Sequence, residues 1–298
     1  MSVAMDEDIK SLLQNEAERV NRRLQALLGT YQGACPRLAE AMRYSLDAGG
    51  KRLRPALVLW CCELCGGDTE KAMPAALAVE CVHTFSLIHD DLPALDNDDV
   101  RRGKPTNHKV FGEAMAILAG DGLLALAFEL LARDVSDPRK TLAMIRELAD
   151  AAGWQGMIGG EAADVQGESL PPDAAVVSRI HAAKTARLIE AACRLGGIAA
   201  GAAEKQLSVL GSYGEALGLA FQAADDLLDL TGGAKAIGKK TGKDAASGKQ
   251  TYPRAVGTEE AYRMAMEEVE NAIAALEPFG SRAARLVALA LYVVERES

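Results

Sequence analysis

The chain has 298 residues, a formal net charge of -9 and a hydrophobic fraction of 49%. This balance argues against nucleic acid as the main partner, because no basic face large enough to follow a phosphate backbone appears. The N-terminus is acidic and amphipathic, so we expect no signal peptide. The apolar runs are too short and too interrupted to predict a transmembrane segment. Together these features favour a cytoplasmic protein.

Composition and spacing predict an all-α protein. Aromatic residues make up only 4% of the chain, whereas Ala, Leu and Glu are abundant and β-branched runs are few. No linker divides the sequence, so we expect a single domain over residues 1–298. Apolar residues recur at helical spacing. The helices expected on this basis cover, in order, residues 1–30, 36–46, a stretch from Pro55, 73–91, 111–132, 137–154, a long stretch from Asp173, the segment around Asp225, 259–276 and 281–298.

The first acidic cluster stands where one of these apolar helices ends. It contains Asp90, Asp91 and Asp96, and it is followed at once by Arg101 and Arg102. Crowded carboxylates repel one another unless a divalent cation lies among their oxygens. Because guanidinium groups match phosphate oxygens, the pattern predicts a metal-bridged phosphate that arginine holds from its other side. Taken alone, the stretch could also be a solvated acidic loop.

A second acidic cluster lies far along the chain. Asp225 and Asp229 are four residues apart on a helical segment, so they share one face, with Asp226 beside them. Like charges one turn apart destabilise a helix unless something binds between them. Two such clusters therefore suggest one cavity with metals on opposite walls.

A glycine turn begins a third candidate site. Gly49 and Gly50 precede Lys51 and Arg54, and a proline then opens a helix. Backbone N–H groups and the helix dipole favour an anion at such a position. The sequence thus indicates a second phosphate site, although an ordinary helix start with exposed cations is the alternative.

Five further positions are candidates for a role in the site. Lys184 and Thr185 stand inside a helix rich in alanine, where the lysine needs either an exit to water or an anionic partner. Gln222 precedes the second acidic cluster. A segment rich in Gly and Lys follows that cluster, includes Lys239 and Lys249, and is typical of a lid over phosphate.

Two metal motifs are incomplete. Glu80 and His83 form the Glu-x-x-His unit of di-iron helix bundles, but such bundles need two copies and the chain has one. Cys62 and Cys65 form a C-x-x-C pair without a second ligand pair, so we do not expect a zinc site.

As a set, these motifs resemble those of the trans-isoprenyl diphosphate synthases. DDLPALDNDDVRRG and DDLLD look like the family's first and second aspartate-rich motifs, and GGKRLRP is similar to its basic loop. The spacing between Asp91 and Asp96 resembles that of bacterial farnesyl and plant-type geranylgeranyl enzymes. The resemblance implies the isoprenoid-synthase fold, in which antiparallel helices surround a deep central cavity, usually as a homodimer.

The resemblance also implies a reaction, in which isopentenyl diphosphate condenses with an allylic diphosphate, dimethylallyl or geranyl, by ionisation, condensation and elimination. About three Mg²⁺ ions, which Mn²⁺ can replace, would stabilise the departing diphosphate. Their ligands would be Asp90, Asp91, Asp96, Asp225 and Asp229. The allylic diphosphate would contact Arg101, Lys184 and Lys239, and isopentenyl diphosphate would contact Lys51, Arg54, His83 and Arg102. Thr185 and Gln222 would stabilise the carbocation, and Lys249 would help to close the lid.

Product length would depend on the cavity floor, which in this family lies about one turn before the first aspartate. Here that position holds Phe85 and Ser86. An aromatic ring there would stop chain growth early, so we expect farnesyl diphosphate. Geranylgeranyl or geranyl diphosphate is the alternative, and Phe85 could instead be an ordinary core residue.

Three other protein classes compete with this interpretation. A non-catalytic prenyltransferase subunit would have lost its acidic clusters, and a terpene cyclase would lack DDLLD and the basic loop. An iron-binding bundle is the most distant of the three.

Overall fold

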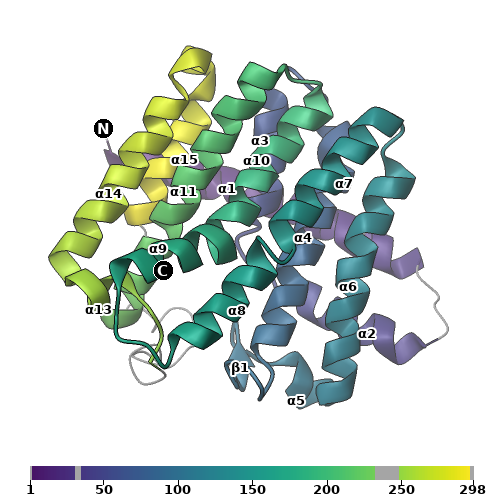
Figure 1. Ribbon diagram of the computed structural model, residues 1–298. Helices are drawn as coiled ribbons and strands as arrows, with labels where there is room; N and C mark the ends of the chain where they lie inside the picture. Colours follow the sequence, from purple (N-terminus) through teal and green to yellow (C-terminus); the bar gives the residue numbers. More distant parts are fainter. Residues whose placement is uncertain (1, 31–34, 232–247, 296–298) are drawn as a thin grey trace.

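The computed structural model describes residues 2–30, 35–231 and 248–295, and helices account for nearly all of its regular structure (Figure 1). The all-α prediction is therefore confirmed. The helices are α1 (Ser2–Thr30), α2 (Pro36–Leu46), α3 (Leu53–Leu64), α4 (Thr69–Asp90), α5 (Asn107–Phe111), α6 (Glu113–Asp134), α7 (Pro138–Ala152), α8 (Met157–Gly167), α9 (Ala174–His181), α10 (Arg187–Ala200), α11 (Glu204–Thr231), α13 (Tyr252–Val256), α14 (Thr258–Ala275) and α15 (Ala284–Glu295). Two antiparallel strands of two residues each, β1 (Val100–Arg101) and β2 (Lys104–Pro105), form a small hairpin after the first acidic cluster.

Helix α4 runs through the middle of the bundle and packs against α3, α6 and α10. Nearly all of its residues from Ala72 to Val82 are buried. A helix that is apolar on every side is stable only when other elements surround it. It begins at Thr69, earlier than expected, because the carboxylate of Asp68 caps the N–H of Glu70 at 2.9 Å. Its C-terminal end carries Asp90 out of the core.

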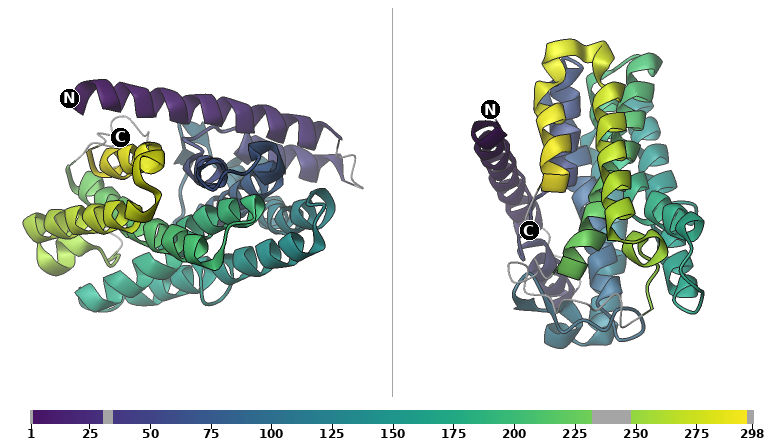
Figure 2. Two further views of the ribbon diagram at one scale, coloured as in Figure 1. Left: turned by 90° about the horizontal axis from the view of Figure 1, so that it is seen from above. Right: turned by 90° about the vertical axis from the view of Figure 1, so that its left-hand side faces the viewer.

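Helix α1 lies along one side of the bundle, across the direction of the central helices (Figure 2). Ile9, Leu13, Val20 and Leu24 are spaced so that one face of α1 is buried. This face packs on α3 and α15, so the N-terminal helix joins the same hydrophobic core as the C-terminal one.

Two of the described helices are long and apolar enough to cross a membrane by length and composition. The hydrophobic window of α4 is 72% buried inside the protein, as expected for a core helix, whereas that of α6 is only 44% buried. On α6, the apolar residues Ala114, Ile117, Leu118 and Ala125 are exposed together with the charged Asp121, and we call this surface the α6 face.

The long helix expected from residue 173 is interrupted by a π-helical turn between α9 and α10, at Ala182–Ala186. Two neighbouring helices approach this turn closely through glycines. A Cβ at Gly160 of α8 would lie 2.3 Å from the backbone nitrogen of Lys184, and one at Gly218 of α11 would lie 2.4 Å from Ala186 Cα. Tertiary packing thus accompanies the irregular turn, and π turns often occur at functional sites.

Candidate active site

Asp90 and Asp96 are held beside each other at the end of α4. The backbone N–H of Asp96 donates to the carbonyl oxygen of Asp90 at 2.8 Å, so the loop folds back onto the helix end. Burial, the nearby carboxylate of Glu161 and that of Asp96 raise the pKa of Asp90 to about 7. This crowding of carboxylates favours a bound cation.

Asp91 is buried and faces Arg101 instead. The Nε of Arg101 donates to both carboxylate oxygens of Asp91, at 2.8 and 3.0 Å, and Nη2 lies 2.7 Å from Oδ1. The β1–β2 hairpin places Arg101 at this position. Both carboxylate oxygens of Asp91 are thus engaged in a forked ion pair with Arg101.

Lys184 projects from the π turn between two carboxylates of α8. Its Nζ lies 2.6 Å from Glu161 and 2.7 Å from Asp164. Although burial alone would lower it, Asp164, Glu161 and Asp90 raise the pKa of Lys184 above its usual value, so the ammonium stays charged. These acids supply the anionic partner that the sequence led us to expect, but the sequence alone gave neither of them a role.

A chain of contacts connects the two acidic clusters. Lys184 is close enough to Asp90 for their charges to interact, and the next residue, Thr185, donates its hydroxyl to Gln222 Oε1 at 2.7 Å. Gln222 stands three residues before Asp225 on α11. Its Nε2 donates to Asp226 Oδ1 at 3.1 Å, so these contacts lead from the end of α4 to the second cluster on α11. That the two clusters line one cavity stays a prediction. Asp229 is half-buried on the same face as Asp225.

The carboxylates of the two acidic clusters are suitable ligands for magnesium. Within residues 2–30, 35–231 and 248–295, no three His, Cys, Asp or Glu side chains gather closely enough to hold a metal by themselves. Mg²⁺ commonly binds through one or two protein carboxylates, with substrate phosphates completing its shell. Carboxylates on two separate walls suit that arrangement.

A basic cluster lies next to this region and contains Arg54, His83 and Arg102. The buried Nε of Arg54 has no hydrogen-bond partner, and burial and the charge of Arg102 contribute to a pKa of Arg54 lowered to about 10. Burial and the charges of Arg54 and Arg102 lower the pKa of His83. Because these basic groups lie close together and a buried N–H donor has no partner, the cluster favours the binding of an anion. Lys51 is exposed at the start of the same loop.

Gly50 is required at the basic cluster. Its φ is +125°, and a Cβ there would lie 2.6 Å from the guanidinium carbon of Arg102. The Arg102 guanidinium also donates to the carbonyl oxygen of Gly49. The double glycine therefore lets Arg102 pack directly on the turn that precedes α3.

Glu80 serves a structural ion pair. Arg52, at the left-handed start of α3, is buried and contacts Glu80, and its Nε donates to Asn21 at 2.8 Å. The glutamate of the single Glu-x-x-His unit is thus occupied by an arginine, which argues against the iron-bundle alternative.

Lys249 reaches the first acidic cluster from the C-terminal part of the chain, with its Nζ 2.8 Å from Asp96 Oδ1. The neighbouring Gln250 is buried and fixes this segment, because its side chain donates to the carbonyl oxygens of Gly167 and Leu170 at 2.9 and 3.0 Å. Lys239, for which we predicted a diphosphate contact, lies outside the described residues.

The two candidate floor residues differ in their surroundings. Phe85 is 5% exposed, and its ring packs edge-on against His89 with centroids 5.6 Å apart. Ser86 is half-buried, and its hydroxyl donates to the carbonyl oxygen of His83 at 3.0 Å. Ser86 therefore has more accessible surface one turn before Asp90 than Phe85 has.

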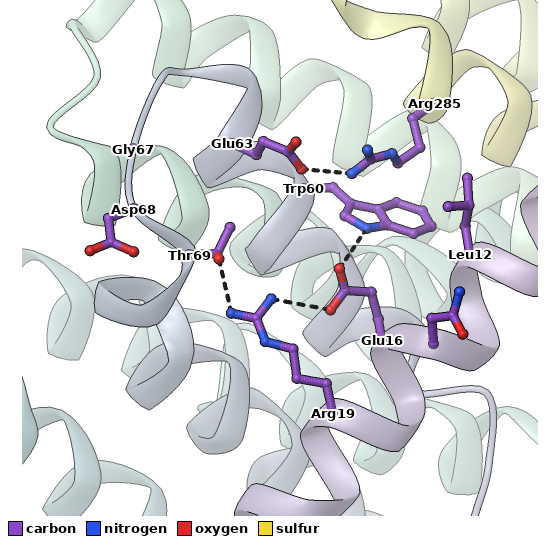
Figure 3. Close-up of a pocket in the computed structure, with 10 residues that line it drawn as sticks. Leu12, Glu16, Arg19, Trp60, Glu63, Gly67, Asp68, Thr69 and Arg285 are labelled. Atoms are coloured by element: carbon purple, nitrogen blue, oxygen red, sulfur yellow. Dashed lines mark hydrogen bonds and ion pairs between the residues drawn. The ribbon is translucent and has the colours of Figure 1, made fainter.

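A separate cavity of about 540 Å³ lies between α1, α3 and α15 (Figure 3). Four of its charged side chains form ion pairs: Arg19 contacts Glu16, and Arg285 contacts Glu63. Asp68 and Thr69 line it at the N-terminal end of α4. A 22-residue helix is about 33 Å long, so this cavity is remote from Asp90.

Comparison with known proteins agrees with this arrangement. The family model of the polyprenyl synthetases matches residues 35–285. Geranylgeranyl pyrophosphate synthase 11 of Arabidopsis thaliana, a chloroplastic enzyme, is 46% identical over 98% of this chain and 83% of its own length. A farnesyl/geranylfarnesyl diphosphate (FPP/GFPP) synthase of Zymomonas mobilis superposes with a TM-score of 0.86 at 39% identity, over 99% of this chain and all of the other. A geranyltransferase of Legionella pneumophila gives a TM-score of 0.85 at 34% identity, over 98% of each chain.

The structural matches confirm the isoprenoid-synthase fold. The matches in sequence extend across both acidic clusters and the basic cluster. The chain belongs to the polyprenyl synthetase family and is a short-chain prenyltransferase.

Proposed function

We propose that this prenyltransferase uses its two acidic clusters to ionise an allylic diphosphate, dimethylallyl or geranyl, and joins the cation to isopentenyl diphosphate. The observation that carries this proposal is the series of contacts from Asp90 through Lys184, Thr185 and Gln222 to Asp226, the neighbour of Asp225 in the second cluster. It connects the first cluster with the helix that carries the second, and it includes the charged lysine beside Asp90. Mg²⁺, bound with the diphosphate, supplies the Lewis acid that stabilises the leaving group.

Asp90, Asp96, Asp225 and Asp229 are the proposed metal ligands. We propose that Asp91, which we expected to be a ligand like the others, mainly holds Arg101; its forked pair with that arginine supports this role. Arg101 and Lys184 then face the diphosphate with their charges intact, as both have pKa values raised by carboxylates despite burial.

The basic cluster is the proposed site of isopentenyl diphosphate, with Lys51 at its edge. Three crowded cationic or basic groups and the unused Nε of Arg54 make this the described region that most requires an anion. Because a diphosphate carries several negative oxygens, it can satisfy Arg54 and Arg102 together. Its alkene end then extends toward Thr185 and Gln222, whose oxygens stabilise the cation without capturing it.

We further propose geranylgeranyl diphosphate as the main product, in place of the farnesyl diphosphate expected from Phe85. Seven more plant relatives, 43–47% identical, also carry geranylgeranyl pyrophosphate synthase in their names. The half-buried Ser86 one turn before Asp90 supports this choice, since a hydroxymethyl group leaves room for a longer chain. Farnesyl diphosphate is the second candidate, because Phe85 stands beside that position.

The test is to incubate the enzyme with isopentenyl diphosphate and each allylic primer, with and without Mg²⁺, and to measure product length. Mg²⁺-dependent formation of a twenty-carbon product is expected from the proposed product. Ser86→Phe should shorten the product, whereas Phe85→Ala should leave the maximum length unchanged. A fifteen-carbon product that lengthens only in Phe85→Ala would instead identify Phe85 as the floor. No product with any primer would contradict the proposed reaction.

We also propose that the chain forms one domain and a homodimer through the α6 face. Large apolar side chains there remain exposed, Ile117 by 44% and Leu118 by 52%, and the alanines beside them allow a second α6 to approach closely. Leu118→Glu should shift the molar mass measured by light scattering from dimer to monomer. Leu170→Glu, at a similarly exposed loop residue, should not.

The cytoplasmic location inferred from composition is part of this proposal. The plant relatives are named chloroplastic, so cell fractionation with an antibody against the protein is the direct test.

A further inference from the structure

Asp226 stands between two proposed metal ligands, but its carboxylate faces the protein interior. It is 4% exposed. Oδ1 accepts a hydrogen bond from Gln222 Nε2 at 3.1 Å, and Oδ2 accepts one from the backbone N–H of Tyr252 at 3.0 Å. His181 Nε2 lies 3.4 Å from the same Oδ2. Both oxygens of Asp226 are thus used within the protein.

These contacts fix which way the amide of Gln222 points. A carboxylate only accepts hydrogen bonds, so the amide group facing Asp226 must be the NH₂ group. Gln222 Oε1 then faces Thr185 and accepts its hydroxyl hydrogen at 2.7 Å. Because that hydrogen is engaged, the remaining polar capacity of the Thr185 oxygen is its lone pairs, which only accept or stabilise positive charge.

The other groups around Asp226 favour this orientation of the Gln222 amide and the Thr185 hydroxyl. The Tyr252 N–H is a backbone donor and has no acceptor form. Burial lowers the pKa of His181 to about 3, so its ring is neutral and can donate from Nε2 to Asp226. The ring of His181 also packs edge-on against Tyr252, with centroids 4.9 Å apart. The backbone N–H of Tyr252 therefore requires an acceptor at residue 226, and neutral His181 is compatible with one.

We propose that Asp226 is a positioning residue that sets the hydrogen-bond polarity of Gln222 and Thr185, so that Thr185 presents its oxygen lone pairs to the carbocation. The inference rests on the proposed function, in which an allylic cation forms beside Thr185. Asp226 acts through two side chains and touches neither metal nor substrate. It is distinct from Asp225 and Asp229, which share its motif.

Asp226→Asn tests this polarity with almost no change of shape. The asparagine oxygen must face the Tyr252 N–H, so its NH₂ group faces Gln222. The Gln222 amide then turns over and directs its own NH₂ group at Thr185, whose hydroxyl hydrogen is displaced toward the cavity. We expect kcat to fall by about tenfold or more, while KM for both diphosphates changes by less than about threefold, because only the transition state carries the cation.

The matched control is the swapped pair Asp226→Asn with Gln222→Glu. It keeps the net charge, lets the asparagine donate to the new carboxylate, and restores an acceptor for the Thr185 hydroxyl. The swap should regain about tenfold in kcat over Asp226→Asn alone, whereas Gln222→Glu alone places two carboxylates together and should be at least as slow as Asp226→Asn. A purely structural role for Asp226 would not produce this rescue.

Each variant is assayed for kcat, KM and thermal unfolding. A folded swap variant no faster than Asp226→Asn, or wild-type kcat in Asp226→Asn, would overturn the inference. If Asp226→Asn does not fold, Gln222→Met is the second variant, because it removes the side-chain amide that connects Asp226 to Thr185. An unchanged kcat in Gln222→Met would likewise overturn the inference. If the proposed function itself were wrong, the wild-type protein would form no product, and this outcome is distinguishable from failure of the inference about Asp226.

Discussion

Lys249 Nζ lies 2.8 Å from Asp96 Oδ1 across 153 residues of sequence, and this contact joins the segment after α11 to the end of α4. Gln250 anchors this segment by donating to the carbonyl oxygens of Gly167, at the end of α8, and Leu170, in the α8–α9 connection. The position of Lys249 is therefore fixed by the surrounding structure. Both side chains are less than one-fifth exposed. The pair positions a cation directly beside a proposed metal ligand.

Lys249→Ala should weaken binding of the allylic diphosphate more than it weakens folding. The ion pair itself contributes about 1 kcal/mol or less at such a partly exposed position. Loss of a cation next to the diphosphate should raise KM for the allylic substrate by about tenfold. Steady-state kinetics measure this, and Lys71→Ala at the other end of α4 is the control that should leave KM unchanged. Equal KM values in the two variants would contradict the role.

Helical periodicity was enough to predict that Asp225 and Asp229 lie on one face of a helix. The four-residue spacing placed Asp225 and Asp229 on one face, and both are half-buried, whereas Asp226 is turned inward. The partners of Asp226 could not be predicted in the same way. His181 and Tyr252 come from other helices, and only tertiary packing brings them to α11.

The π turn is a clear example of a feature that the local sequence does not predict. Residues 174–200 contain no proline and no glycine before Gly196, so local propensity predicts an unbroken helix. The close approaches at Gly160 and Gly218 involve residues from α8 and α11, which the local sequence of the turn does not reveal. For the same reason the sequence shows that Glu161 and Asp164 are acidic, but it does not predict that they pair with Lys184.

Gly160→Ala should be strongly disruptive. The new Cβ would meet backbone atoms of the π turn at 2.3 Å, which cannot move aside as a flexible side chain can. We expect a loss of about 1–3 kcal/mol in the free energy of unfolding and reduced activity, because the turn carries Lys184. Gly29→Ala, at the C-terminal end of α1, is the control: nothing lies within 4 Å, and it should change the free energy of unfolding by about 0.5 kcal/mol or less. Urea denaturation of both variants measures the difference, and similar stabilities would refute the packing argument.

Lys184 and Asp164 should show a strong coupling energy. Lys184→Met leaves the buried Asp164 and its neighbour Glu161 without their cation, so we expect a loss of about 3–5 kcal/mol in the free energy of unfolding. Asp164→Asn in the same chain removes one of the uncompensated charges. The double variant should therefore lose less than the sum of the two single variants. A double-mutant cycle by denaturant unfolding measures the coupling, and additive losses would mean that the 2.7 Å contact contributes little.

Magnesium binding should be linked to a proton on Asp90. With its pKa raised to about 7 by burial and by Glu161, the metal-free side chain is mostly protonated below pH 7 and ionised above it. Mg²⁺ requires the ionised form, so its apparent affinity should fall by up to about tenfold for each pH unit below 7 and level off above it.

Calorimetric titration of Mg²⁺ with a non-ionising allylic diphosphate analogue, in buffers of different ionisation enthalpy, counts the released protons. The diphosphate releases protons of its own, so the informative quantity is the difference between the wild type and Asp90→Asn. That difference should approach one proton near pH 6 and vanish near pH 8.5, because the wild-type carboxyl is already ionised there. Asp99→Asn, at a 70% exposed carboxylate, is the control and should match the wild type. The same proton release in Asp90→Asn as in the wild type would mean that Asp90 is already ionised at the lower pH, or that it does not bind the metal.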